Sequence, residues 1–263
     1  PMIQMLRISA LSSYPPVAGR EPHWTLDNWL LFFQNPNYIT PFTRTFIFAF
    51  SFTAITLLIT YPIAYFLARH VRPNRQLLFL LLLLAPFWVG EIVRTFAIMI
   101  LLGNRGFLNI ALMQIGLIEQ PVPFMYTTFS LGFGVVYLTA LYMLLPLYAS
   151  LEKIPKNYFE AAADLGAGPI ARLRRITLPL SRDGIAPGCA LVFLISTGYH
   201  GTPILLGGPS TTLFAETIGG FFAVAGDQWP VGAAFSSILF ISTLAVAGVF
   251  IKLMGGKRGG ILA

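Results

Sequence analysis

The sequence predicts an all-α, polytopic membrane protein built as a bundle of spanning helices. Hydrophobic residues make up 56% of its 263 positions and charged residues only 10%, whereas a soluble domain carries about 25% charged residues. The mean hydropathy is +0.74. Five stretches are apolar over about 20 residues, the length that crosses a bilayer as a helix. They are too long and too uniformly apolar for the strands of a transmembrane barrel.

The five predicted spans lie between residues 42 and 254. They cover residues 42–67, 77–102, 129–148, 185–206 and 231–254. Four of them contain a proline, which favours a kink: Pro62, Pro86, Pro146 and Pro203. Such kinks are either ordinary packing features or the mark of a bundle that surrounds a pathway.

The basic residues predict the orientation in the membrane. Twelve of the 17 Lys and Arg residues fall in the turn at 69–75, the loop at 150–183 and the tail, which includes Lys252, Lys257 and Arg258. The positive-inside rule places these segments, and so the C-terminus, in the cytoplasm, with residues 14–41 outside. The net charge of +7 is therefore a signal of topology and not of nucleic-acid binding.

The 150–183 loop contains a regular motif. The run Glu160-Ala161-Ala162-Ala163-Asp164-Leu165-Gly166 is followed, after nine more residues, by Ile176-Thr177-Leu178-Pro179. It predicts a helix over residues 156–165, with Asn157 as N-cap and Glu160 at the capping-box position, broken at Gly166. A second short helix is predicted over residues 170–176, ended by Pro179. The alanines leave a small face that the groove of a partner can approach closely.

This spacing resembles the EAA loop of ABC-importer permeases, which docks into a groove of the ATPase subunit. Further blocks are similar to permeases of the spermidine/putrescine type, so that the resemblance covers nearly the whole chain: residues 86–95, 102–109, 145–153, 206–209 and 229–234. The resemblance implies that the contacts with the ATPase come from Glu160, Ala161, Ala162, Asp164, Leu165, Gly166, Leu178 and Pro179.

The resemblance also implies a fold and a domain organisation. It implies the type I importer (MetI-like) fold as one transmembrane permease domain over residues 1–263, with six spans in the full protein and five here. Residues 1–8 would then be the end of a first helix whose beginning is absent, and an external segment would follow to residue 41.

Partners and cargo follow from the same resemblance. It implies a second permease of similar fold, a sibling rather than a copy of this chain, two ATP-binding subunits and a periplasmic solute-binding protein. The sequence has no G-x-x-x-x-G-K-[ST] motif, so ATP and Mg²⁺ are expected on the ATPase subunits, with no cofactor and no catalysed reaction in this chain. The expected function is ATP-driven uptake across a bacterial inner membrane of a small amine-bearing solute. A polyamine is the first candidate, and an opine or aminophosphonate is the second.

Ionisable groups at membrane depth point to a solute route. Such groups are costly and usually face the bundle interior or a cavity. Glu91 and Arg94 are three residues apart and can form a structural ion pair. Alternatively, Glu91 lines the path of an ammonium group, with Trp88 on the same helix adding a cation–π contact.

The fourth predicted span ends in a polar, glycine-flanked break at residues 196–203. Broken helices near the midplane are typical of transport sites. Tyr199 and His200 are therefore expected to face the cavity or its external gate, although His200 can equally be a packing residue. No second histidine or carboxylate has metal-ligand spacing to His200, so no metal site is expected. The 207–230 segment is either external or re-entrant.

Two other functional classes fit the sequence less well. An ion-coupled secondary transporter would rest on Glu91 alone and would leave the 160–179 motif unexplained. An intramembrane enzyme would need a paired catalytic set, but the three histidines, His23, His70 and His200, fall in three different regions of the predicted topology.

Overall fold

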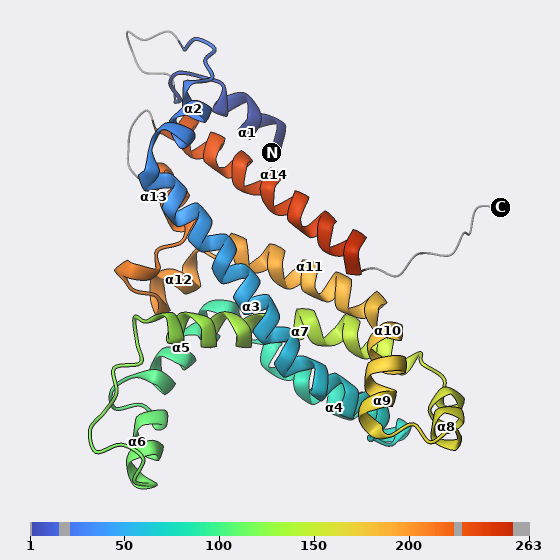
Figure 1. The fold of residues 1–263 in the computed structure, drawn as a ribbon. Helices are drawn as coiled ribbons and strands as arrows, with labels where there is room; N and C mark the ends of the chain where they lie inside the picture. The colour runs from blue at the N-terminus through green and yellow to red at the C-terminus, as the bar shows by residue number, and fades with distance from the viewer. Residues whose placement is uncertain (1, 16–21, 224–227, 255–263) are drawn as a thin grey trace, which may run out of the picture. The chain divides into compact units, whose positions relative to one another are not determined.

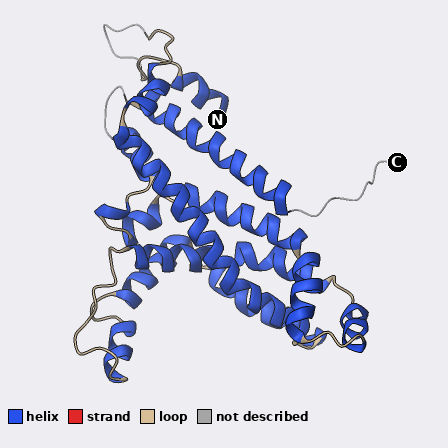
Figure 2. Ribbon diagram, in the orientation of Figure 1, coloured by secondary structure: helices blue, strands red, loops and turns tan. Residues whose placement is uncertain are grey.

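The structure, a computed structural model, describes residues 2–15, 22–223 and 228–254. These residues form helices joined by loops (Figure 1), and Figure 2 shows the same helices against the loops. Apart from one isolated bridge between Leu11 and Trp24, no strand pairing occurs in the described ranges. The predicted all-α class is confirmed. Lys257 and Arg258 of the predicted cytoplasmic tail, and residues 16–21 of the predicted external segment, lie outside the described residues.

Most of the predicted spans are present as helices. Four helical stretches of the described chain are long and apolar enough to cross a membrane: Pro36–Arg69 (α3), Glu91–Gln114, Thr128–Glu152 (α7) and Trp229–Lys252, which lies within α14 (Trp229–Met254). A fifth crossing can come from the stretch Pro169–Leu180 followed by α11 (Arg182–Gly198), which meet at a bend of 67°.

The second predicted span, residues 77–102, is not one helix. The chain forms α4 (Pro73–Leu84), a 3₁₀ turn η1 (Ala85–Trp88) and then α5 (Glu91–Leu102). Pro86 lies in the first turn of η1, because a proline lacks the N–H that a continuing helix needs. Gly90 follows, and glycine weakens a helix interior. The apolar stretch long enough to span therefore begins only at Glu91.

The chain divides into two compact units. The first unit contains Pro1–Phe50, Glu91–Val135 and Ser196–Ala245, and the second contains Ser51–Gly90, Val136–Ile195 and Val246–Ala263. Four helices, α3, α7, α11 and α14, contribute residues to both units. The shorter helices of the second unit follow α7: α8 (Lys156–Asp164), α9 (Pro169–Arg172), the π-helical turn η2 (Leu173–Thr177) and α10 (Leu178–Leu180).

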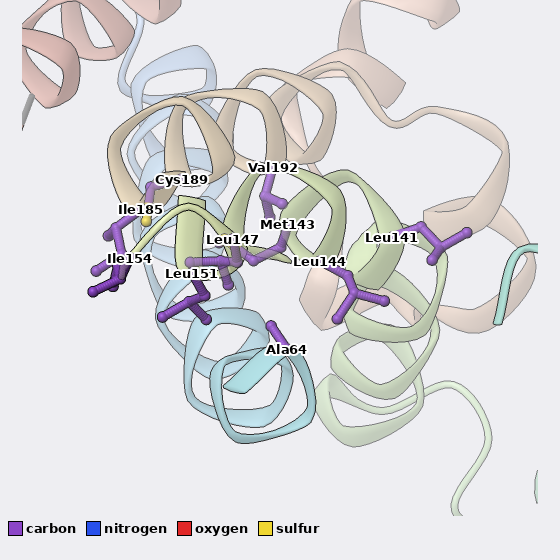
Figure 3. Packing of buried hydrophobic residues seen from close by; sticks show 10 residues of the cluster. All are labelled: Ala64, Leu141, Met143, Leu144, Leu147, Leu151, Ile154, Ile185, Cys189 and Val192. Atoms are coloured by element: carbon purple, nitrogen blue, oxygen red, sulfur yellow. The ribbon is translucent and has the colours of Figure 1, made fainter. Parts of the chain in front are cut away.

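The core of the second unit forms where α3, α7 and α11 pack together. Figure 3 shows ten buried residues of this cluster, from Ala64 on α3, through α7 and the turn at Ile154, to Val192 on α11. Gly184 lets α7 and α11 approach closely, since a Cβ at this position would meet the backbone carbonyl of Pro146 and the side chain of Ser150. Small residues at helix contacts are the usual means of close packing in lipid.

The first unit holds α5 and several shorter elements: α1 (Met2–Ser9), α2 (Asp27–Gln34), α6 (Phe107–Gln114), α12 (Gly201–Leu206), the 3₁₀ turn η3 (Pro209–Thr211) and α13 (Phe214–Ala223). Its core is aromatic. Phe32 of α2, Phe214 of α13 and Phe235 of α14 are buried together, with ring centroids 5.6 to 5.7 Å apart. The Phe214 amide also donates to Thr45 Oγ1 of α3 at 2.8 Å. The 14–41 and 207–230 segments thus each supply a helix that packs within this unit.

The 102–109 block noted in the sequence also has a structural basis in the first unit. A Cβ at Gly106 would collide with the backbone carbonyls of Ile100 and Leu101. The buried Asn109 side chain donates to the carbonyls of Gly103 and Val122, at 3.1 and 3.0 Å, and accepts from the Val122 amide at 2.9 Å. This asparagine therefore fixes the loop after α6 to the helix itself.

The close contact at Gly184 yields a stability prediction. Gly184→Ala would drive a methyl group into the backbone of α7, and overpacking of this kind costs about 1–3 kcal/mol. We expect a lower midpoint of thermal unfolding in detergent. Gly248→Ala on α14 is the matched control, because nothing lies within 4 Å of its added Cβ; it should be neutral or stabilising. Equal midpoints for both variants would contradict this packing.

Candidate functional site

The predicted helix of the 150–183 loop is α8. Its range, Lys156–Asp164, confirms the prediction of a helix over residues 156–165. The predicted capping box is wrong: Pro155 occupies the N-cap position, and no side chain caps this helix end. Proline fixes φ near −65° and has no N–H to satisfy, so the helix begins directly after it, and Asn157 lies two residues after the N-cap position.

Gly166 ends α8 as predicted. Its φ is +77°, in the left-handed region that costs other residues about 1–2 kcal/mol. The Gly166 amide donates to the Ala163 carbonyl at 2.9 Å and the Ala167 amide to the Ala162 carbonyl at 2.8 Å. These bonds satisfy carbonyls that the end of a helix otherwise leaves unpaired.

The second half of the loop is helical beyond the predicted end. The chain passes from α9 through η2 to α10 and ends at Leu180, so the prediction that Pro179 ends the helix is wrong. A proline ring clashes with the carbonyl four residues before it, here that of Arg175. The π-helical turn directly before α10 widens the backbone at this point and accommodates the proline.

The 150–183 loop presents large apolar side chains at its surface. Leu165 is 88% exposed and Ile170 is 80% exposed, one on each side of Gly166. The predicted coupling residues are exposed with them, apart from the half-buried Ala162. Large exposed apolar side chains are typical of surfaces that contact a partner protein or a membrane.

Polar contacts fasten this loop to α3 inside the second unit. Arg69, the last residue of α3, donates from Nη2 to the carbonyls of Leu151 and Ile154, both at 2.8 Å. Its guanidinium carbon lies 4.6 Å from the centre of the Phe159 ring on α8. The Tyr61 hydroxyl lies 3.0 Å from Ser181 Oγ at the end of α10. The sequence indicated Arg69 only as one of several positive charges.

The first unit holds a second polar group of residues, where two broken stretches of helix pack together. Glu91 is the first residue of α5, and Thr202 is in the first turn of α12. Thr202 Oγ1 donates to Glu91 Oε1 at 3.0 Å. Thr95 Oγ1 donates to the Glu91 backbone carbonyl at 2.9 Å and lies 3.4 Å from Thr202 Oγ1. Both threonines are buried, whereas the Glu91 side chain is exposed.

The other predicted route residues lie near these breaks. The predicted polar break is confirmed, since α11 ends at Gly198 and α12 begins at Gly201. Between them, Tyr199 is buried and His200 is exposed. Arg94 is half-buried on α5. Trp88 belongs to the second unit, at the end of η1, and is 90% exposed.

No family model matches the chain. The spermidine/putrescine transport system permease protein PotB of Escherichia coli (strain K12) is 37% identical to it over 218 residues, which cover 83% of this chain and 78% of that protein. This chain belongs to the spermidine/putrescine permease family. It is a multi-pass inner-membrane protein and the permease subunit of an ABC importer, rather than an ion-coupled carrier.

Solved structures agree on the fold of the permease. A bacterial ABC transporter that imports the acidic polysaccharide alginate matches with a TM-score of 0.63 at 17% identity, over 96% of this chain and 88% of that chain. The same kind of transporter, in complex with an alginate pentasaccharide-bound periplasmic protein, matches with a TM-score of 0.60 at 19% identity, over 88% and 83% of the two chains. At these identities the likeness shows the fold alone.

His200 packs on α13 of the permease. Its Nδ1 lies 3.2 Å from the Ala215 carbonyl, and its ring fills the place where a Cβ of Gly219 would be. Glu216 Oε1 accepts the Leu213 amide at 2.8 Å, which caps the start of α13. Burial raises the pKa of Glu216 above its ordinary value of 4.5, and the Leu213 amide and the charge of His200 offset part of this effect. Among the described residues, no group of three or more His, Cys, Asp or Glu side chains can hold a metal ion.

The raised pKa of Glu216 gives a pH prediction. A folded-state pKa above the unfolded value contributes stability below pH 4.5 that is lost as pH rises through the folded value. Gln at this position stays neutral and can still accept the Leu213 amide. We therefore expect Glu216→Gln to flatten the fall of the unfolding midpoint as the pH rises above 4.5. Glu119→Gln, at an exposed acid of the same unit, should leave the wild-type slope. Parallel slopes for Glu216→Gln and wild type would contradict the assignment.

Proposed function

We propose that this permease imports a polyamine-like solute in a complex with a sibling permease, two ATP-binding subunits and a periplasmic solute-binding protein. The 37% identity to a permease named for spermidine and putrescine carries the proposal. A negatively charged, accessible carboxylate at a helix break, Glu91, fits a cationic cargo. An opine or aminophosphonate, each of which also bears an amine, is the second candidate.

Charge supports a cytoplasmic C-terminus and 150–183 loop. Every described Lys and Arg of the three basic segments belongs to the second unit. The described cations of the first unit are only Arg7, Arg44, Arg94 and Arg105. By the positive-inside rule, these basic segments of the second unit, and with them the C-terminus, lie in the cytoplasm.

The exposed surface of α8 and α9 is the proposed contact with the ATPase. Leu165 and Ile170 supply apolar area, and Glu160 and Asp164 supply charge beside it. ATP and Mg²⁺ are bound in the partner. When the two ATPases close on ATP, they move this loop, and the helices joined to it switch the solute route from inward to outward exposure.

The left-handed glycine tests this contact. Gly166→Val should distort the end of α8, because a β-branched residue is strained at a φ of +77°. We expect at least about tenfold less ATPase to co-purify with the permease from mild detergent, since 1.4 kcal/mol corresponds to a factor of ten. Gly168→Ala is the matched control: its φ of −67° suits any residue and its Cβ position is open. Undiminished ATPase recovery and uptake in Gly166→Val would sink the docking proposal.

Glu91 is the proposed contact for an ammonium group of the solute. It continues the stripe of Thr95, Ile98 and Leu102, the buried face of α5. The opposite face carries Ile92, Val93, Phe96 and Ile100, which are exposed. A carboxylate that faces lipid is costly. Because Glu91 lies at the end of the buried face of α5, we infer that its exposed carboxylate faces water. Trp88, Arg94, Tyr199 and His200 remain proposed members of the same route.

Removal of the Glu91 charge tests the cargo. Glu91→Gln keeps the size of the side chain and can still accept from Thr202, so the fold should persist. A hydrogen bond between charged groups contributes about 1.5–3 kcal/mol, so we expect uptake of labelled spermidine into proteoliposomes to fall about tenfold or more. Glu119→Gln serves as the control for a lost negative charge. If both variants transport alike, Glu91 does not contact the cargo.

A further inference from the structure

We propose that Arg69 is the positioning residue that transmits movement of the 150–183 loop to α3. This inference rests on the proposed function, in which the loop is moved by an ATPase, and it names the residue that carries the movement into the membrane-spanning helices. It depends on contacts that lie wholly within the second unit.

Arg69 joins three consecutive parts of the loop's beginning. Its Nη2 binds the carbonyl of Leu151 in the last turn of α7 and the carbonyl of Ile154 in the following turn. The guanidinium carbon lies over the ring of Phe159, 4.6 Å from its centre, one residue before Glu160 in α8. Leu151 and Ile154 are buried in the core cluster, and Phe159 packs against it. One cation thus holds the end of α7, the turn and the coupling helix at fixed positions relative to α3.

The chemistry of arginine suits this role. The last carbonyls of a helix carry partial negative charge, so a cation placed there is stabilised. The planar guanidinium can donate in its plane and stack on a ring with its face at the same time, whereas the lysine ammonium cannot. Carbonyl binding and stacking on Phe159 therefore reinforce each other.

A second residue releases Arg69 from capping its own helix. Gln76 Nε2 donates to the carbonyls of Leu67, Ala68 and Val71, at 3.3, 3.5 and 3.2 Å. Its Oε1 accepts the hydroxyl of Tyr148 on α7 at 3.2 Å. Because Gln76 satisfies the end of α3, the guanidinium of Arg69 is available to the α7 end and α8.

The end of the loop is fixed to the same helix. Tyr61, eight residues before Arg69 on α3, meets the buried Ser181 at 3.0 Å. Tyr61 and Tyr65 line a hollow of about 280 Å³ with Pro169, Ile170 and Leu173. Both ends of the loop are therefore attached to the last turns of α3. Because the loop is held at both ends, a displacement of α8 also displaces α3.

Charge alone does not explain this position. Arg72 and Arg75 lie in the same basic turn and are exposed. Under the positive-inside rule, these two residues indicate a cytoplasmic position of the turn as well as Arg69 does. Arg72→Gln thus removes the same charge from the same turn and serves as the matched control.

The test uses the full complex, purified with its ATPase subunits, reconstituted in proteoliposomes and supplied with its binding protein and spermidine. We expect Arg69→Gln to retain the ATPase subunits and basal ATP hydrolysis. Stimulation of hydrolysis by the loaded binding protein, and uptake, should both fall about tenfold or more, because hydrogen bonds to a charged group are lost. Arg69→Lys, which can still reach a carbonyl, should recover part of the uptake, and Arg72→Gln should match wild type.

Two results would overturn the proposal. One is wild-type stimulation and uptake in Arg69→Gln. The other is loss of the ATPase subunits from both Arg69→Gln and Arg69→Lys, which would make Arg69 a folding element of the docking surface only. A wild-type complex that contains no ATPase, or does not take up spermidine, would instead count against the proposed function and would leave the Arg69 variants without a defect to show.

Discussion

The close contact of α7 with α11 is the constraint on which the second unit depends. The 150–183 loop begins at the end of α7 and ends at the start of α11, and Gly184 lets α11 lie directly against the backbone of α7 at Pro146. The two ends of the loop are therefore held together by helix packing, not by the loop itself. The hollow of about 280 Å³ beside Ile170 and the hydrogen bonds of Arg69 and Tyr61 lie between this loop and α3. A larger residue at position 184 would separate the helices and loosen all of them.

Local chemistry let the sequence predict much of this arrangement. Gly166 adopts a left-handed φ that other residues avoid, so this single glycine was enough to predict the end of α8. The run from Ser196 to Pro203 is polar and contains two glycines, and the structure breaks the helix at Tyr199 and His200. The apolar stretches predicted the class and most of the spans, because the length needed to cross lipid is set by the membrane. In each case the signal lay in the segment that forms the feature.

The features that the sequence missed depend on residues far apart in the chain. Arg69 meets Leu151 and Ile154 more than 80 positions later, and nothing near Arg69 distinguishes it from Arg72. Thr202 meets Glu91 across 111 positions, so neither threonine of that group was a candidate. The prediction of one continuous helix over residues 77–102 was wrong for another reason. Hydropathy is averaged over a window of residues, and Pro86 and Gly90 interrupt the helix without lowering the average around them. Pro179 was misread because the π-helical turn directly before it widens the backbone, so that the helix continues to Leu180.

The fold cannot by itself select the cargo. The permease shares its fold with a transporter of alginate, an acidic polysaccharide, whereas its relative in Escherichia coli is named for the cations spermidine and putrescine. One helix arrangement therefore serves solutes of opposite charge, and discrimination has to come from side chains on that frame and from the protein that delivers the solute. Such side chains are expected where helices break, because only there do backbone and polar groups meet water inside the membrane. Glu91, the proposed contact for the ammonium group, meets this requirement, since it is an exposed carboxylate at a helix break and accepts a hydrogen bond from Thr202.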